Sequence, residues 1–243
     1  MTFRTDAPMR TIHDRAPQQD GAERLLLVML PGAADVPEGF LRHGFVEALR
    51  ERRLPVDAIL VDAHVDYYLE RSIGERLARD VIVPARSSQY RQIWLLGMSL
   101  GGMGALIGAR DHPAEIDGVI LLAPFLGNRG RIAGIMRGGG LSDWQPGETE
   151  PQDDEQALLA WLKAYPSSDP ALPAIHLGYG VSDRYSAASE MLAQRLPAER
   201  VATTQGGHDW ETWTRLWKRF LDQGLFSGRA ALERPHAQAA AKI

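Results

Sequence analysis

The stretch Ile93-Trp94-Leu95-Leu96-Gly97-Met98-Ser99-Leu100-Gly101 decides the fold. Its four leading apolar residues predict a buried strand, and the glycine- and alanine-rich residues that follow predict a helix. Gly97 and Gly101 flank Ser99 at the spacing that a sharp strand-to-helix turn requires, because bulk two residues to either side would collide there. This context predicts a nucleophilic serine rather than a chance match to the pattern.

Short apolar runs alternate with longer segments of helical period along the rest of the chain. This alternation predicts βαβ crossovers and therefore a mainly parallel central sheet with helices on both faces. The expected strands are 25–30, 56–61, 93–96, 116–123, 174–178 and 200–204, and the expected helices are 38–53, 67–83, one after Ser99, 186–196 and 209–221. Pro84 is expected to interrupt the second of these helices, and the aromatic stripe of the last one is expected to be core.

The chain has 243 residues, which suits one α/β domain, placed here at 23–223. Residues 1–22 lack the apolar centre of a secretory signal and are expected to form a flexible arm. Residues 127–150 are rich in glycine and are expected to form a lid-like insertion without a packed element. Residues 224–243 are expected to be a loosely ordered tail.

Composition excludes several functional classes. A formal net charge of -4 predicts no nucleic-acid partner, and the absence of cysteine excludes disulfides, thiolate zinc sites and cysteine nucleophiles. The longest apolar stretches are far shorter than the roughly 20 residues that span a bilayer, so no membrane insertion is expected. We expect a cytoplasmic protein, and a homodimer is an open alternative.

A serine hydroxyl is a poor nucleophile near neutral pH, so Ser99 needs an imidazole to take its proton and a carboxylate to orient that imidazole. His208 follows the pair Gly206-Gly207 between the last strand and the last helix, and Asp183 lies just past the preceding strand. The order Ser, Asp, His with all three at strand ends is that of the α/β-hydrolase fold. We therefore expect a compact version of this fold.

Each partner of Ser99 has an alternative. Asp183 could instead cap a helix or form a turn, and Asp62, which ends an earlier strand, is the rival orienting acid. Asp209 is expected to be a first-turn helix residue, and Asp35 with Glu38 has the spacing of a helix capping box.

Backbone N–H groups near Ser99 are candidates for an oxyanion hole. The N–H of Leu100 follows the nucleophile at a helix N-terminus, and the loop after strand 25–30 offers Ala33, with Gly32 as its alternative. In that loop Pro31 has no N–H to offer, and the alternative is that Pro31-Gly32 merely ends a strand.

Side chains that could line a substrate pocket are less well determined. The candidates are Gly32, Tyr67, Tyr68, Met98, Phe125, Met136 and Trp144, and the alternative for each aromatic or methionine is a place in the core. Arg129, Arg131 and Arg137 could attract an acidic substrate or form a solvated face.

The segment Gly97-Met98-Ser99-Leu100-Gly101-Gly102-Met103-Gly104-Ala105-Leu106 resembles the elbow of the esterase D branch of serine hydrolases, which includes S-formylglutathione hydrolases and feruloyl esterases. Gly207-His208-Asp209-Trp210 with Trp213 is similar to the histidine signature of that branch, and Tyr67-Tyr68-Leu69-Glu70 also resembles it. The small carboxylesterases and acyl-protein thioesterases fit the chain length about as well. The resemblance implies a serine hydrolase of carboxylic esters or thioesters without metal or organic cofactor.

Three functions remain for this site. The first is hydrolysis of a small-molecule ester or thioester through an acyl-enzyme on Ser99. The second is acyl transfer by the same three residues to an acceptor other than water. The third is a hydrolase-fold binding protein without turnover.

Overall fold

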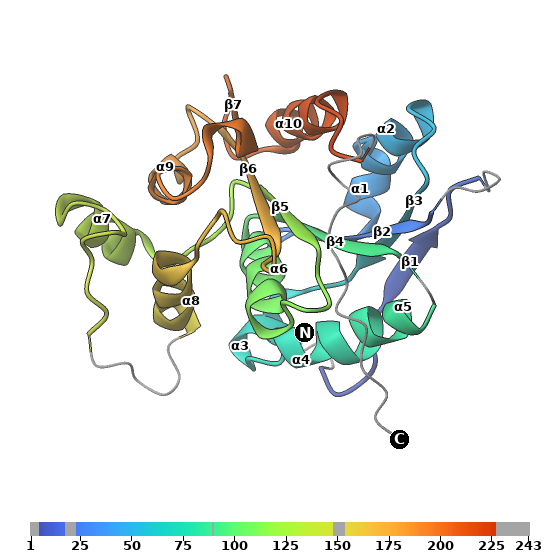
Figure 1. Ribbon diagram of the computed structural model, residues 1–243, viewed down its shortest axis with the longest axis horizontal. Helices are drawn as coiled ribbons and strands as arrows, with labels where there is room; N and C mark the ends of the chain where they lie inside the picture. Colours follow the sequence, from blue (N-terminus) through green and yellow to red (C-terminus); the bar gives the residue numbers. More distant parts are fainter. Residues whose placement is uncertain (1–4, 18–22, 89, 148–153, 227–243) are drawn as a thin grey trace.

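A mainly parallel sheet forms the centre of the molecule. The computed structural model describes residues 5–17, 23–88, 90–147 and 154–226. Within these residues seven strands occur in the order β1-β3-β2-β4-β5-β6-β7 (Figure 1). They are β1 (Thr11–Asp14), β2 (Leu25–Leu30), β3 (Val56–Val61), β4 (Gln92–Met98), β5 (Gly118–Leu122), β6 (Ala174–Gly180) and β7 (Val201–Thr204). All neighbours are parallel except β1, which runs antiparallel to β3.

Helices cover both faces of this sheet, as the alternating sequence pattern predicts. They are α1 (Glu38–Arg42), α2 (Phe45–Glu51), α3 (Val65–Leu69), α4 (Ile73–Leu77), α5 (Val83–Ser87), α6 (Leu100–Asp111), α7 (Arg129–Arg137), α8 (Asp154–Ala164), α9 (Ser186–Ala193) and α10 (Trp210–Asp222). Figure 1 shows α1, α2 and α10 on one face and α3 to α6 on the other. This architecture confirms the predicted α/β-hydrolase class.

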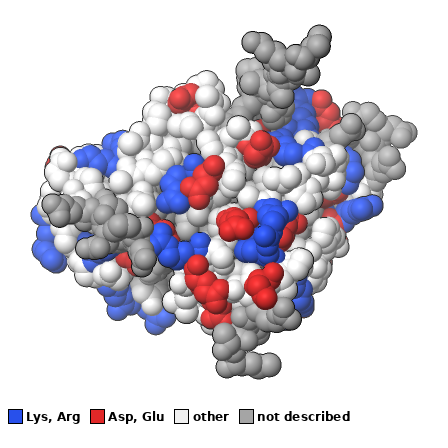
Figure 2. Space-filling view, turned by 90° about the horizontal axis from the view of Figure 1, so that it is seen from below, with Lys and Arg blue, Asp and Glu red and all other residues white. Residues whose placement is uncertain are grey.

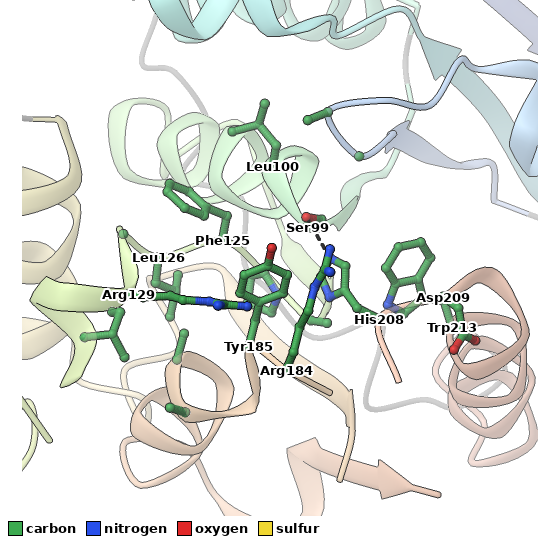
Figure 3. A pocket seen from close by; sticks show the side chains of 18 of the residues that line it. Ser99, Leu100, Phe125, Leu126, Arg129, Arg184, Tyr185, His208, Asp209 and Trp213 are labelled. Carbon is green, nitrogen blue, oxygen red and sulfur yellow. Dashed lines mark hydrogen bonds between the residues drawn. The ribbon is translucent and has the colours of Figure 1, made fainter. Parts of the chain in front are cut away.

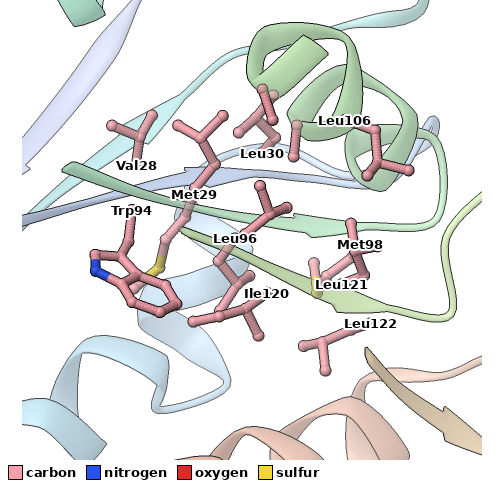
Figure 4. Close-up of a cluster of buried hydrophobic side chains, with 14 of the residues drawn as sticks. Val28, Met29, Leu30, Trp94, Leu96, Met98, Leu106, Ile120, Leu121 and Leu122 are labelled. Atoms are coloured by element: carbon pink, nitrogen blue, oxygen red, sulfur yellow. The ribbon is translucent and has the colours of Figure 1, made fainter. Parts of the chain in front are cut away.

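The central strands are buried along their whole length, which is why they read as nearly continuous apolar runs. Figure 4 shows side chains of β2, β4, β5 and α6 packed together, among them Met98. Met98 is fully buried and belongs to this core, so its expected place in the pocket is wrong. The packed sheet fixes the strand ends, and β4 delivers Ser99 to one of them.

Two expected helices are divided in the structure. Residues 38–53 form α1 and α2, which meet at Gly44, whose φ of 72° is left-handed. Residues 67–83 form separate short helices, and the chain stays helical past Pro84 to Ser87. A π-helical segment, Ala78–Ile82, precedes Pro84, which has no N–H to donate to the preceding turn. The period of the apolar residues therefore locates these helical segments but not the points at which they divide.

Two segments expected to lack packed elements contain them. Residues 11–14, inside the predicted flexible arm, form edge strand β1, whose backbone pairs with β3. Residues 129–137, inside the predicted excursion, form α7, which packs against α9. Asn128 caps α7 by accepting a hydrogen bond of 3.0 Å from the Arg131 N–H. The predicted tail lies almost entirely outside the described residues.

Candidate active site

Ser99 occupies a strained turn between β4 and α6. Its φ of 49° and ψ of -118° lie in a region that non-glycine residues rarely adopt, at a cost of about 1 to 3 kcal/mol. The turn is held by the Ser99 N–H, which donates to the Leu122 carbonyl at 3.1 Å, and by the Ser99 carbonyl, which accepts from the Phe125 N–H at 2.8 Å. The serine hydroxyl is thereby presented at the end of the strand.

The flanking glycines are required by backbone contacts. A Cβ on Gly97 would overlap the backbone of Gly101, and a Cβ on Gly101 would overlap the carbonyls of Leu30 and Pro31. The start of α6 thus packs directly against β4 and the end of β2. The sequence pattern reflects a steric limit on both sides of the nucleophile candidate.

The structure brings Ser99, His208 and Asp183 together. The Nε2 atom of His208 lies 2.9 Å from the Ser99 Oγ atom, and its Nδ1 atom lies 2.7 Å from the Asp183 Oδ2 atom (Figure 3 shows the contact with Ser99). The Asp183 side chain is 1% exposed and that of His208 is 15% exposed. The carboxylate therefore accepts from Nδ1 and leaves Nε2 free to accept the serine proton.

The loops that carry His208 and Asp183 are tied to each other. The Val181 N–H donates to the Thr204 carbonyl and the Ser182 N–H donates to the Gly206 carbonyl, both at 3.0 Å. The Asp183 Oδ1 atom also accepts from the Tyr185 N–H at 2.8 Å. These bonds fix the distance between the carboxylate and the imidazole.

The other acids occupy different places. Asp62 follows β3, two strands away from β4, near Tyr67, whose pKa is raised by burial and, to a smaller extent, by the charge of Asp62. Asp209 caps α10 by accepting a bond of 2.8 Å from the Thr212 N–H, and that bond lowers the pKa of Asp209. Asp183 is thus the acid that faces His208.

The loop between β2 and α1 lies directly beside Ser99. A Cβ built on Gly32 would stand 3.6 Å from the Ser99 Cβ and 3.0 Å from the Asp35 Oδ2 atom. The N–H of Leu100 is the first of α6, one of the four N–H groups that a helix leaves unbonded at its start. Both oxyanion candidates, Leu100 and Ala33, line the same cavity as Ser99.

This cavity has a volume of about 830 Å³ and opens beside Ser99 and His208 (Figure 3). Phe125, Leu126, Ile132 and Ala188 give it an apolar wall, to which α7 and α9 contribute. A cavity of this size with few polar groups around a reactive centre suits a small organic substrate.

Comparison with known proteins agrees with this geometry. A family model described as "Putative esterase" matches residues 66–223. The chain belongs to this esterase family. It is therefore a hydrolase of carboxylic esters. A search of curated proteins finds no match to the esterase.

Solved structures with the same fold include other ester hydrolases. An S-formylglutathione hydrolase (FrmB) from Staphylococcus aureus is 15% identical, with a TM-score of 0.55 over 83% of this chain and 81% of that one. Est1E from Butyrivibrio proteoclasticus, with ferulic acid bound, is 17% identical, with a TM-score of 0.53 over 88% and 94%. A monoacylglycerol lipase from Paleococcus ferrophilus is 16% identical, with a TM-score of 0.57 over 91% and 99%. At these identities the likeness shows the shared fold.

Several expected pocket residues of the esterase lie elsewhere. Tyr67 is buried with its ring 4.2 Å from that of His64, and Tyr68 packs against Gly104 of α6, where burial raises its pKa. Trp144 is half-buried, and its carbonyl accepts a hydrogen bond from Lys163. Their aromatic surface serves packing, which is the alternative that the sequence left open. Gly32 and Phe125 do line the cavity.

The cavity also contains residues that the sequence analysis missed. The rings of Tyr185 and Trp213 meet the His208 ring edge-on, at centroid distances of 4.9 and 5.0 Å. The Asp35 Oδ1 atom accepts a hydrogen bond of 3.0 Å from the Trp210 Nε1 atom, although the two residues are 175 positions apart. This bond ties the loop between β2 and α1 to α10, the helix that follows His208. The sequence predicts both tryptophans in the aromatic stripe of the last helix, and it predicts Asp35 only in a helix capping box.

Three observations on the described residues bear on metal ions, membranes and nucleic acids. Among the described residues, no three His, Asp or Glu side chains gather so as to hold a metal ion. No described helix combines the length and apolar composition needed to cross a bilayer. The face shown in Figure 2 carries acidic and basic side chains intermixed, without a continuous basic surface in the parts that are described.

Proposed function

We propose that the esterase cleaves carboxylic esters, and thioesters by the same chemistry, through an acyl-enzyme on Ser99. His208 takes the proton of the Ser99 hydroxyl as its oxygen attacks the carbonyl carbon, and returns that proton to the leaving alcohol or thiol. Water then attacks the acyl-enzyme with His208 again as base, which releases the acid and restores the hydroxyl. The observation that carries this proposal is the chain of two short contacts from Asp183 through His208 to Ser99.

The developing negative charge needs fixed donors. We assign this role to the backbone N–H groups of Leu100 and Ala33, which flank Ser99 from the start of α6 and from the β2–α1 loop. The positive end of the α6 dipole adds to the first of them. One such donor contributes roughly 3 kcal/mol to stabilising the transition state.

The described part of the insertion, residues 127–147, is proposed to cover the substrate through α7, whereas residues 148–150 lie outside the described residues. Ile132 and Ala133 of this helix line the cavity. Shielding the acyl-enzyme from bulk water would also permit transfer to an alcohol, which is the alternative function of the same site. Adding an alcohol to the assay separates the two, because transfer forms an acceptor-dependent new ester.

The test is Ser99→Ala measured on short-chain 4-nitrophenyl esters. Loss of the nucleophile is expected to lower kcat by about four orders of magnitude or more. Ser182→Ala is the matched control, because Ser182 is exposed, lies beside Asp183 and lacks a place in the proposed chemistry. Turnover unchanged by Ser99→Ala, or absent in the unmodified protein at every acyl length, would contradict the proposal and favour a binding protein.

A further inference from the structure

Two arginines at one side of the cavity share a single aromatic ring. The guanidinium carbon of Arg129 lies 4.6 Å from the Tyr185 ring centroid and that of Arg184 lies 4.9 Å from it. All three residues line the cavity (Figure 3). Arg129 begins α7 and Arg184 follows Asp183, so two separate segments supply these charges.

These polar groups have no partner among the residues that the structure describes. In that part of the chain, neither guanidinium forms an ion pair or a hydrogen bond, and the Tyr185 hydroxyl forms no hydrogen bond. The neighbouring Arg131 differs, because it pairs with Glu155 at 3.2 Å. Figure 3 shows the Tyr185 hydroxyl directed into the cavity on the side of Ser99. Two like charges beside one ring repel each other, and an anion bound near both of them would relieve that repulsion.

The acids of the cavity lie apart from this pair and are already engaged. Asp35 accepts from Trp210, and Asp209 caps α10 on the far side of His208 from Tyr185 (Figure 3). The cavity is therefore polarised, with free cationic groups at the α7 side. A guanidinium pairs most strongly with a carboxylate or phosphate, through two parallel hydrogen bonds.

We propose that Arg129 and Arg184 select esters that carry a second, anionic group, such as a free carboxylate, a few bonds from the scissile carbonyl. The spacing follows from the Tyr185 ring, which touches both guanidinium groups and the imidazole of His208. This assignment rests on the proposed function, because it names the substrate class of the same site. Phe125 and Ile132 then contact the apolar part of such a substrate.

The test compares matched charged and neutral esters on the intact protein. One pair is the 4-nitrophenyl monoester of glutarate against 4-nitrophenyl pentanoate, with the anion on the acyl side. The other is 4-acetoxybenzoate against 4-acetoxybenzamide, with the anion on the alcohol side. Each kcat/KM is divided by the spontaneous hydrolysis rate. A preference of about tenfold or more for the anion in at least one pair is expected, and it should fall as ionic strength rises.

Substitution assigns the preference to the two arginines. Arg129→Gln with Arg184→Gln is expected to lower kcat/KM of the preferred anionic ester by about tenfold to a hundredfold and that of its neutral partner by less than about twofold. Arg129→Lys with Arg184→Lys keeps both positive charges but loses the planar guanidinium groups that can form two parallel hydrogen bonds. This variant should recover part of the loss. Arg137→Gln is the control, because Arg137 lies on the same helix but is not among the cavity-lining residues.

The possible outcomes separate the two proposals. Neutral esters cleaved in a Ser99-dependent way, with no anion preference in either pair or an equal loss for charged and neutral esters in the Gln variant, would overturn the arginine assignment alone. Turnover that does not depend on Ser99 would instead contradict the proposed function.

Discussion

The two walls of the cavity are built in different ways. On one wall, the turn that carries Ser99 is confined by backbone atoms of β2, β4 and α6, so that neither Gly97 nor Gly101 has room for a methyl group. On the other wall, α7 packs against α9, and a Cβ on Gly134 would meet no described atom within 4 Å. The turn that carries Ser99 is therefore confined by rigid backbone, whereas α7 leaves open space at Gly134.

The charged side chains of the two walls also differ in how firmly they are held. Asp183 is buried and its oxygens accept bonds from His208 and Tyr185, so its position is fixed before substrate arrives. Arg129 and Arg184 are exposed, lie over the Tyr185 ring, and form no hydrogen bond or ion pair within the described structure. Fixed charge suits proton transfer, and adjustable charge suits recognition of a substrate.

The largest expected effect of a single substitution beyond Ser99 is that of Asp183→Asn. The amide keeps the size of the side chain but favours the wrong tautomer of His208, so kcat should fall about a thousandfold to ten-thousandfold. Asp62→Asn, the rival acid, is the control and should leave kcat unchanged. Steady-state kinetics of both variants on one ester measures this, and the reverse ranking would contradict the assignment.

Gly101→Ala tests the confinement of the serine turn. The new methyl group would overlap the carbonyls of Leu30 and Pro31, which belong to the rigid backbone. Overpacking of this kind is expected to lower the free energy of unfolding by about 3 kcal/mol and to displace Ser99. Urea unfolding measures the loss. A variant within about 0.5 kcal/mol of the unmodified protein would show that the turn is not so confined.

Acid should destabilise the fold through the buried imidazole of His176. His176 of β6 lies between Trp94 and Phe220, and burial lowers its pKa to about 4. The folded protein thus disfavours the charged form, so the stability that neutral His176 provides is complete above its unfolded pKa of about 6.5 and is lost as pH falls toward 4. Between pH 7 and pH 5, His176→Gln should lose about 2 kcal/mol less than the unmodified protein. Equal pH dependence of unfolding in the two proteins would contradict this.

The smallest effect is expected from Gly134→Ala in α7. Alanine favours a helix interior over glycine by about 1 kcal/mol, and the space around Gly134 is open. The free energy of unfolding should therefore rise by about 0.5 to 1 kcal/mol, opposite in sign to Gly101→Ala. A loss of stability at Gly134 would remove the contrast between the two walls.

The sequence predicted the confined wall well, because its constraints are local. The glycines on each side of Ser99 and the glycine pair before His208 can be recognised directly in the sequence. The steric reason for the glycines beside Ser99 holds in any chain with this turn. The positions of the central strands along the chain also followed, since parallel strands buried on both faces need apolar residues at every position.

The contacts between distant segments around the cavity could not be predicted in the same way. Asp35 and Trp210 are far apart in the chain, and Arg184 gains its meaning only from its contact with Tyr185 and from Arg129 on another helix. Strand β1 was missed because its four residues take their pairing from β3 rather than from an apolar pattern of their own. Tyr67 and Tyr68 were misplaced because aromatic residues are common in cores and pockets alike.

Covalent capture of the nucleophile tests the central claim most directly. The protein is treated with a fluorophosphonate, and the adduct is located by mass spectrometry of its peptides. The account predicts one adduct, on Ser99, formed much more slowly in a His208→Ala variant. An adduct on another residue, or continued ester turnover after Ser99 is fully modified, would contradict it.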